Sequence, residues 1–98
     1  MIDAGELTRE FFETKIGEVF TLGTQPVVEL KLLEVVAWGA QLANGGRDPF
    51  RLEFTGPAGL RMPQQIYRMT LASGEAMELF LVQVADAPEG SRVEAIFS

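Results

Sequence analysis

From Glu18 to Phe97, apolar residues recur at every second position in short runs, and clusters of glycine, proline, asparagine and aspartate separate the runs. This alternation is typical of β-strands, whose successive side chains point to opposite faces. Phe50, Leu52 and Phe54, which alternate with polar residues, show the pattern most clearly. The sequence therefore predicts a mainly β fold.

The runs predict six antiparallel strands, at residues 19–22, 27–38, 50–55, 64–71, 75–84 and 92–97. Ser73 and Gly74 predict a tight turn between the fourth strand and the fifth. The apolar phase changes after Leu32, which predicts a β-bulge near Leu32 and Leu33. A chain of 98 residues is the size of a single domain. We expect residues 1–98 to form a small six-stranded antiparallel barrel or sandwich.

Residues 3–16 have a different spacing, which is that of a helix. Asp3 is a candidate N-cap with Glu6 three residues later. We expect one N-terminal amphipathic α-helix over residues 3–16 that packs on a second apolar face of strand 75–84. Its apolar residues are Leu7, Phe11, Phe12 and Ile16. The expected core of the domain comprises Phe20, Leu30, Leu52, Phe54, Tyr67, Leu79, Phe80 and Phe97.

The composition argues against several classes of function. The chain has no histidine and no cysteine, which removes the usual hydrolase triads and most zinc and iron ligands. Its 14 acidic and 8 basic residues give a net charge of −6, which opposes binding to nucleic acid or anionic lipid. We expect no enzyme activity, no cofactor or metal, and neither nucleic acid nor membrane as a partner. Residues 1–6 lack the apolar stretch of a signal peptide, so we expect cytoplasmic synthesis.

The charged residues offer few candidates for catalysis. Paired carboxylates could perform glycosidase-type chemistry, but we expect these side chains to face solvent and pair with arginines across strands. The glutamates concerned are Glu53, Glu78 and Glu94. Lys15 and Lys31 could form a Schiff base only if activated, and we expect ordinary exposed amines. Asn44 and Asp48 are interpreted as loop-forming residues rather than cation ligands.

Apolar residues in two predicted loops suggest a surface for a protein partner. These residues are Trp38, Leu42, Leu60 and Met62, with Arg47 and Arg61 expected at the rim. Two alternatives remain open: the loops form a partner-binding patch, or they fold back and close the ends of the barrel. In the first alternative Trp38 contributes most, about 2 kcal/mol or more.

A second candidate site lies at the start of strand 64–71. Gln64, Gln65 and Tyr67 could bind a polar small molecule such as a sugar at the mouth of the barrel. The alternative is that Tyr67 is a core aromatic whose hydroxyl reaches the rim, with the two glutamines at the strand entrance.

Several sequence elements together resemble one bacterial family. They include Gly17-Glu18-Val19-Phe20, Pro49-Phe50-Arg51-Leu52-Glu53-Phe54, Gln64-Gln65-Ile66-Tyr67 and Leu79-Phe80-Leu81-Val82. The chain resembles uncharacterised domains of about 100 residues, which are often encoded beside tail-collar-type phage fibre proteins. The resemblance implies a phage-like or extracellular assembly, and it transfers no catalytic or binding residue.

These observations favour a non-enzymatic protein-binding or assembly module, such as an accessory or adaptor component of a phage-tail-like structure. Its expected partner is another protein, such as a fibre component, and the sequence does not specify an oligomeric state. The alternative is a small-molecule or carbohydrate-binding β domain. An enzyme using Glu53, Glu78 or Glu94 ranks third.

Overall fold

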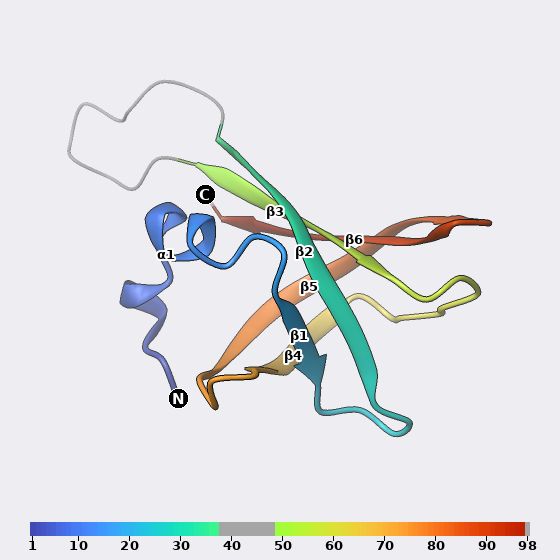
Figure 1. The fold of residues 1–98 in the computed structure, drawn as a ribbon, viewed down its shortest axis with the longest axis horizontal. Coiled ribbons are helices and arrows are strands. Elements are labelled where there is room, and N and C mark those ends of the chain that lie inside the picture. Colours follow the sequence, from blue (N-terminus) through green and yellow to red (C-terminus); the bar gives the residue numbers. More distant parts are fainter. Residues whose placement is uncertain (38–48, 98) are drawn as a thin grey trace.

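A computed structural model describes residues 1–37 and 49–97 of the chain (Figure 1). It confirms the mainly β fold with six antiparallel strands, and it selects the barrel over the sandwich. The strands are β1 (Val19–Leu22), β2 (Val28–Ala37), β3 (Phe50–Gly56), β4 (Gln65–Leu71), β5 (Ala76–Ala87) and β6 (Gly90–Phe97). A 3-10 helix, η1 (Ala4–Glu6), and a short helix, α1 (Arg9–Glu13), precede them.

The strands form a closed sheet in the order β1-β2-β3-β6-β5-β4. Pairing of β1 with β4 closes the barrel, with Phe20 opposite Leu71 and Leu22 opposite Met69. Each strand therefore has two neighbours, and closure protects the strand edges that would otherwise pair with another chain. The turn at Ser73 and Gly74 joins β4 to β5 as predicted.

The barrel interior is filled by the alternate residues of each strand. Phe20 and Phe54 meet edge to face with ring centroids 5.3 Å apart. Burial of one such side chain stabilises the fold by about 1.5–3 kcal/mol. Six predicted core residues are buried: Phe20, Leu30, Leu52, Phe54, Tyr67 and Leu79. Phe97 is partly buried and packs against this core.

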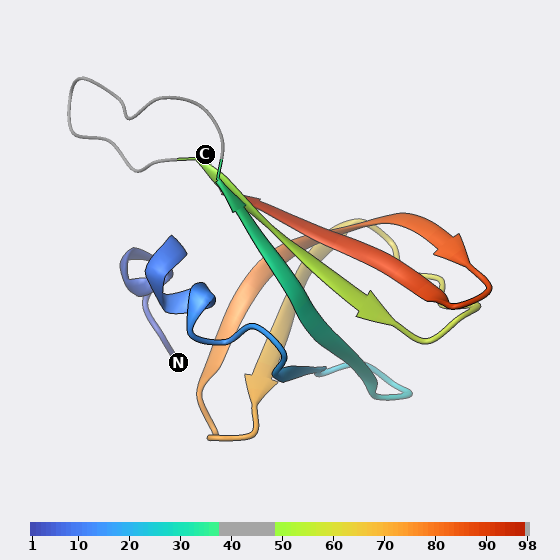
Figure 2. The same ribbon diagram turned by 45° about the horizontal axis from the view of Figure 1, so that its top comes forward.

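The prediction that Phe80 is a core residue is wrong, because 49% of its surface is exposed. Its neighbours Leu79 and Leu81 are buried, and successive side chains of a strand point to opposite faces. We expected the N-terminal helix to cover the face of β5 that carries Phe80. In the structure α1 instead lies at one end of the barrel (Figure 2).

A single helix over residues 3–16 is also a wrong prediction. The Asp3 side chain makes no capping bond, and Leu7 leaves helical geometry with ψ of 75°. The Thr8 hydroxyl accepts a hydrogen bond from the Phe11 amide at 3.2 Å, so the α-helix starts after Thr8. A threonine at this position favours a cap over continuation of the helix. What forms is η1 followed by the five-residue α1.

The short α1 closes one end of the barrel with Phe12, which is fully buried. The ring centroid of Phe12 lies 5.5 Å from that of Phe97 and 6.2 Å from that of Phe50. Phe50 and Phe97 stack on each other at 4.6 Å across β3 and β6. This end of the barrel is therefore closed by aromatic packing.

The predicted β-bulge is confirmed, since the β2–β3 register shifts between Leu32 and Glu34. A second shift, between Gln83 and Ala85 on β5, was not predicted. Gln83 is opposite the buried Val93, and beyond the bulge Asp86 is opposite the buried Ser91. The extra residue thus places Gln83 and Asp86 on the same side of the sheet.

Candidate binding groove at the open end of the barrel

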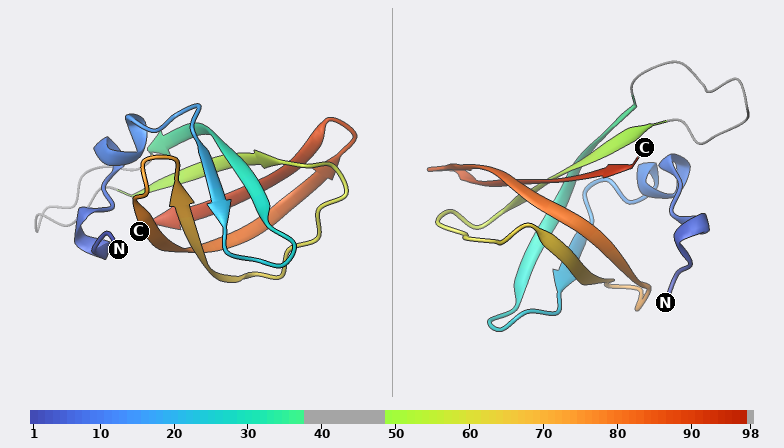
Figure 3. Two further views of the ribbon diagram at one scale, coloured as in Figure 1. Left: turned by 60° about the horizontal axis from the view of Figure 1, so that its bottom comes forward. Right: turned by 180° about the vertical axis from the view of Figure 1, so that it is seen from behind.

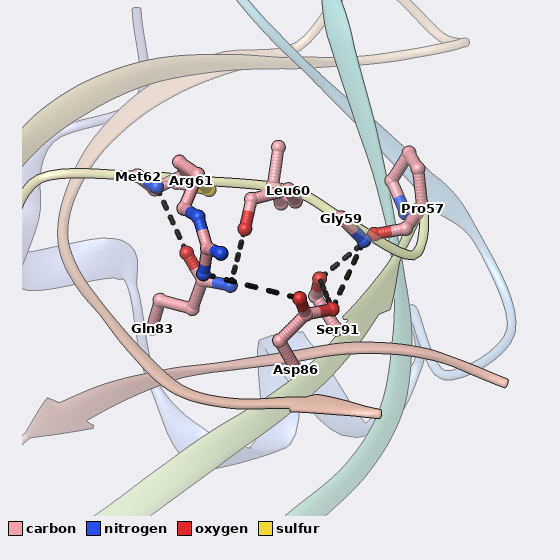
Figure 4. Close-up of polar contacts among 8 residues, drawn as sticks. All are labelled: Pro57, Gly59, Leu60, Arg61, Met62, Gln83, Asp86 and Ser91. Carbon is pink, nitrogen blue, oxygen red and sulfur yellow. Dashed lines mark hydrogen bonds and ion pairs between the residues drawn. The ribbon is translucent and has the colours of Figure 1, made fainter. Parts of the chain in front are cut away.

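The connection from β3 to β4 is held against β5 by the Gln83 side chain (Figure 4). The Met62 amide donates to Gln83 Oε1 at 2.8 Å, and Gln83 Nε2 donates to the Leu60 carbonyl at 2.7 Å. One amide side chain therefore satisfies a donor and an acceptor of the loop backbone. Because these bonds are partly buried, they fix the conformation of residues 60–62.

Asp86 and Ser91 hold the first half of the same connection (Figure 4). The Gly59 amide donates to Asp86 Oδ1 at 3.0 Å, and the Ser91 hydroxyl donates to the Pro57 carbonyl at 2.7 Å. Ser91 is fully buried, and its Oγ also lies 3.3 Å from Asp86 Oδ1. Gly90 allows the close approach at this point, because a Cβ there would lie 2.8 Å from the Gly56 carbonyl oxygen.

Tyr67 holds the other end of the connection. Its hydroxyl donates to the Pro63 carbonyl at 2.6 Å, and burial raises the pKa of the phenol. The side-chain bonds therefore reach backbone groups along the whole connection, at Pro57, Gly59, Leu60, Met62 and Pro63. We call residues 57–63 the tethered loop.

A groove of about 510 Å³ separates the tethered loop from the turn between β1 and β2. Both segments lie away from α1, as the two views in Figure 3 show. The turn contributes Thr24, Gln25 and Pro26, and the Thr24 hydroxyl donates to the Pro26 carbonyl at 2.8 Å. The rest of the lining is largely apolar, with Leu22, Val28, Leu60, Met62, Pro63 and Tyr67. The groove is a concave surface at the open end of the barrel.

The groove contains part of each predicted site. Leu60 and Met62 line it and also pack against the core, so the loop both folds back on the barrel and contributes to a surface hollow. Arg61 lines it too, with 85% of its side chain exposed and one nitrogen 3.9 Å from Asp86. The remaining residues of the predicted partner patch, Trp38, Leu42 and Arg47, lie outside the described residues.

The predicted ligand-binding residues fall at the same end of the barrel. Gln65 and Tyr67 line the groove, whereas the exposed Gln64 lies beside it and is not part of the lining. Tyr67 is 5% exposed, so it is a core aromatic whose hydroxyl reaches the rim. The structure therefore brings Leu60, Arg61 and Met62 together with Gln65 and Tyr67 in one groove.

The glutamates considered for catalysis lie outside this groove. Glu53 and Glu94 are opposite each other on β3 and β6, and Arg51 Nε lies 2.8 Å from Glu53 and 3.8 Å from Glu94. Glu78 is opposite Arg68. The expected pairing with an arginine across strands is therefore seen for Glu94, whereas Glu53 pairs with Arg51 along its own strand, β3.

The lysines occupy two different surroundings, and neither contributes to the groove lining. Lys31 is exposed, as expected. Lys15 is less exposed than expected and lies 3.3 Å from Glu75. Hydrogen bonds from Ser73 and then Lys15 lower the pKa of Glu75. The loop residues Asn44 and Asp48 lie outside the described residues.

The residues that hold the loop, Gln83, Asp86 and Ser91, were not among the predicted site residues. One signal in the sequence could have found Gln83. Gln83 follows Met77, Leu79 and Leu81 at every second position of β5, on the side that faces the barrel interior. A polar side chain on that side needs a hydrogen-bonding partner. Asp86 and Ser91 carried no such signal, because they fall between the predicted strands 75–84 and 92–97.

The fold and the groove define a small antiparallel barrel with one end closed by helix packing and the other shaped as a hollow. The chain belongs to a family described as a domain of unknown function (DUF6916), whose match covers residues 7–97. No curated protein and no solved structure matches the chain significantly. Within residues 1–37 and 49–97, no helix has the length and apolar character needed to cross a membrane.

Proposed function

We propose that this domain is a non-enzymatic protein-binding module that receives a segment of a partner protein in the groove at the open end of the barrel. The observation that carries this proposal is the tethering of the loop over residues 57–63 by Gln83, Asp86, Ser91 and Tyr67. A surface that is already ordered loses little conformational entropy when a partner binds. The fixed loop therefore supports a role in binding.

The lining of the groove supports an apolar segment as its occupant. Leu60 and Met62 supply apolar surface on one wall, and Leu22 and Val28 supply it at the barrel mouth. Arg61, largely exposed at the groove, adds a cation to a chain of net charge −6. An apolar centre with arginine nearby is the composition found at the centres of protein interfaces.

The resemblance to domains encoded beside phage fibre proteins supports a more specific form of the proposal. In this form the domain is an accessory or adaptor component of a phage-tail-like assembly, and the groove binds a fibre or tail protein. Binding through a preformed groove suits an assembly component, because the domain then joins a larger structure without refolding.

A second candidate function is the binding of a small molecule or carbohydrate. The groove volume of about 510 Å³ lies within the range of small-molecule sites. Gln25 and Gln65 place amide groups at the groove, and Tyr67 presents part of its ring. Apolar side chains dominate the lining, however, and the Tyr67 hydroxyl already bonds to Pro63, so a protein segment fits better.

The test is co-purification of the tagged domain from its own cell with two matched variants. Gln65→Trp places a large side chain in the groove, whereas Gln64→Trp makes the same change on the exposed neighbour outside the lining. We expect a protein that co-purifies with the wild type and with Gln64→Trp, and at least tenfold less of it with Gln65→Trp. Circular dichroism should show both variants folded.

Equal recovery of partners with both variants would exclude the groove as the binding site. Mass spectrometry of the intact domain under native conditions addresses the second candidate function. A bound small molecule that Gln65→Trp displaces, with no protein recovered, would replace the proposal by that alternative.

A further inference from the structure

The pairing of β1 with β4 covers only part of β4. The register between the two strands ends with Leu22 opposite Met69. One further backbone bond follows, from the Gly23 amide to the Arg68 carbonyl at 3.0 Å. The first residues of β4, 65–67, have β5 as their only strand neighbour within the described part of the chain. One edge of β4 is therefore open at this end of the barrel.

The alternation of hydrogen bonds shows which backbone groups of β4 are left unpaired. Successive residues of an inner antiparallel strand direct their N–H and C=O groups to opposite neighbours. The Leu71 amide donates to the Glu75 carbonyl at 2.8 Å, so the odd residues of β4 are bonded to β5. The even residues face β1, as the bond to Arg68 shows. Among the described residues, none bonds to the N–H or C=O of Ile66, the even residue beyond the end of β1.

This open edge lies beside the groove. Gln65 and Tyr67, which flank Ile66 in β4, line the groove, and Thr24 and Gln25 line it from the β1–β2 turn. The Ile66 side chain is on the outside of the barrel, and the residue is 65% exposed. A strand added along this edge would direct alternate side chains to the same side as Gln65 and Tyr67, which is the side of the groove.

We infer that the partner segment binds as an added β-strand along the open edge of β4, with hydrogen bonds to the N–H and C=O of Ile66. This inference rests on the proposed function and specifies the conformation of the groove's occupant. An extended polypeptide offers one acceptor and one donor to such a residue, as in other cases of strand addition. The recognised segment is therefore extended, with apolar residues two positions apart that enter the groove.

Ile66 favours this occupant over a helix or a small apolar molecule. A helix bonds its own backbone groups internally, so it would cover the Ile66 N–H and C=O without satisfying them. An added strand satisfies both groups. It also places a side chain next to Ile66 on the outside of the barrel, where Phe80 is already the neighbour from β5.

Amide hydrogen exchange of the free domain, followed by NMR, tests whether the edge is open. The Ile66 amide should exchange about 100-fold faster than the Tyr67 amide, or more, because the register bonds only the latter to β5. Equal protection of the two amides in the free domain would overturn the inference.

Peptides selected on the wild-type domain from a random library test the mode of binding. Single peptide N–H groups are replaced by N-methyl groups, one position at a time. An added strand uses the N–H groups of alternate residues. We therefore expect the dissociation constant to rise about tenfold at every second position and to stay within about twofold at the positions between them. This measurement needs no change in the domain.

Two variants at one position test the contribution of the domain. Ile66→Pro removes the N–H at the open edge without removing a bond to β5, and proline is tolerated at such edges. It should raise the dissociation constant of the selected peptides about tenfold or more. Ile66→Ala, the matched control, keeps the N–H and should raise it only about threefold. Circular dichroism should show both variants folded.

Several results would overturn strand addition. These are the absence of any selected peptide, N-methyl effects without a period of two, and equal effects of Ile66→Pro and Ile66→Ala. Self-association of the free domain that Ile66→Pro abolishes would make a second copy the occupant, against the inference. Peptides released by Gln65→Trp but unaffected by Ile66→Pro would retain the groove as the binding site and exclude strand addition, so the two failures are distinguishable.

Discussion

At the scale of single residues, Tyr67 connects the core of the barrel to the groove at its open end. The ring is 5% exposed and lines the groove, while the hydroxyl donates to the Pro63 carbonyl at 2.6 Å. The same side chain thus contributes to stability through burial and to the shape of the groove through one hydrogen bond. The sequence predicted the buried ring and the hydroxyl at the rim, but not the Pro63 carbonyl as its partner.

Replacement of Tyr67 by phenylalanine should cost about 1 kcal/mol of unfolding free energy at neutral pH, because one buried hydrogen bond is lost. The replacement should also change how the free energy of unfolding depends on pH in the alkaline range. Burial raises the pKa of Tyr67 in the folded state, so the neutral phenol contributes fully to the free energy of unfolding below the unfolded pKa of about 10. This contribution to stability is lost as the pH rises through the folded pKa of Tyr67.

Urea unfolding of the wild type and Tyr67→Phe between pH 7 and 11 measures both effects. We expect the difference in stability between the two proteins to shrink as the pH rises above about 10. A difference that stays constant over this range would contradict the assignment of the alkaline decline to Tyr67.

At the scale of elements, the bulge in β5 and the tethered loop act together. The register shift between Gln83 and Ala85 places Gln83 and Asp86 on one side of the strand, from which they bond to Leu60, Met62 and Gly59. A regular strand would alternate odd and even residues between the two faces and would separate the pair. The bulge is therefore what allows one strand to hold the loop at two places.

Gln83→Leu should lower the free energy of unfolding by about 1–3 kcal/mol, because it leaves the Met62 amide and the Leu60 carbonyl without this partner. Gln64→Leu, the same change at an exposed position, should have an effect within about 0.5 kcal/mol. Urea denaturation of both variants checks the expectation. If the two changes proved equally small, the Gln83 bonds would not hold the loop.

Predictability differed between the elements for physical reasons. The strands and the Leu32 bulge could be predicted because period two is a local property of the sequence. The helix was predicted too long, because Leu7 and Phe11 have helical spacing although Thr8 between them caps the start of α1. Phe80 was assigned to the core by mistake, because the face of β5 that is covered depends on where α1 packs, and that is a tertiary contact.

Leu60, Met62 and Tyr67 were identified individually as candidate site residues. The groove that brings them together depends on Gln83 and Asp86, which lie on a distant strand.

At the scale of the whole molecule, the two ends of the barrel differ. At one end Phe12 of α1 packs against the rings of Phe50 and Phe97. At the other end the tethered loop and the β1–β2 turn form the groove. A small barrel of this kind can be stable through its closed end and its core, while the open end presents a fixed surface. We therefore propose that a partner binds at one end of the molecule, in the groove.

Site-specific photocrosslinking in the protein's own cell tests that assignment most directly. A benzophenone amino acid replaces Arg61, at the groove with 85% of its side chain exposed, or Ile16, which is 48% exposed just after α1. We expect a crosslinked partner protein from position 61 and none from position 16. Crosslinks to the same partner from position 16 and not from position 61 would contradict it.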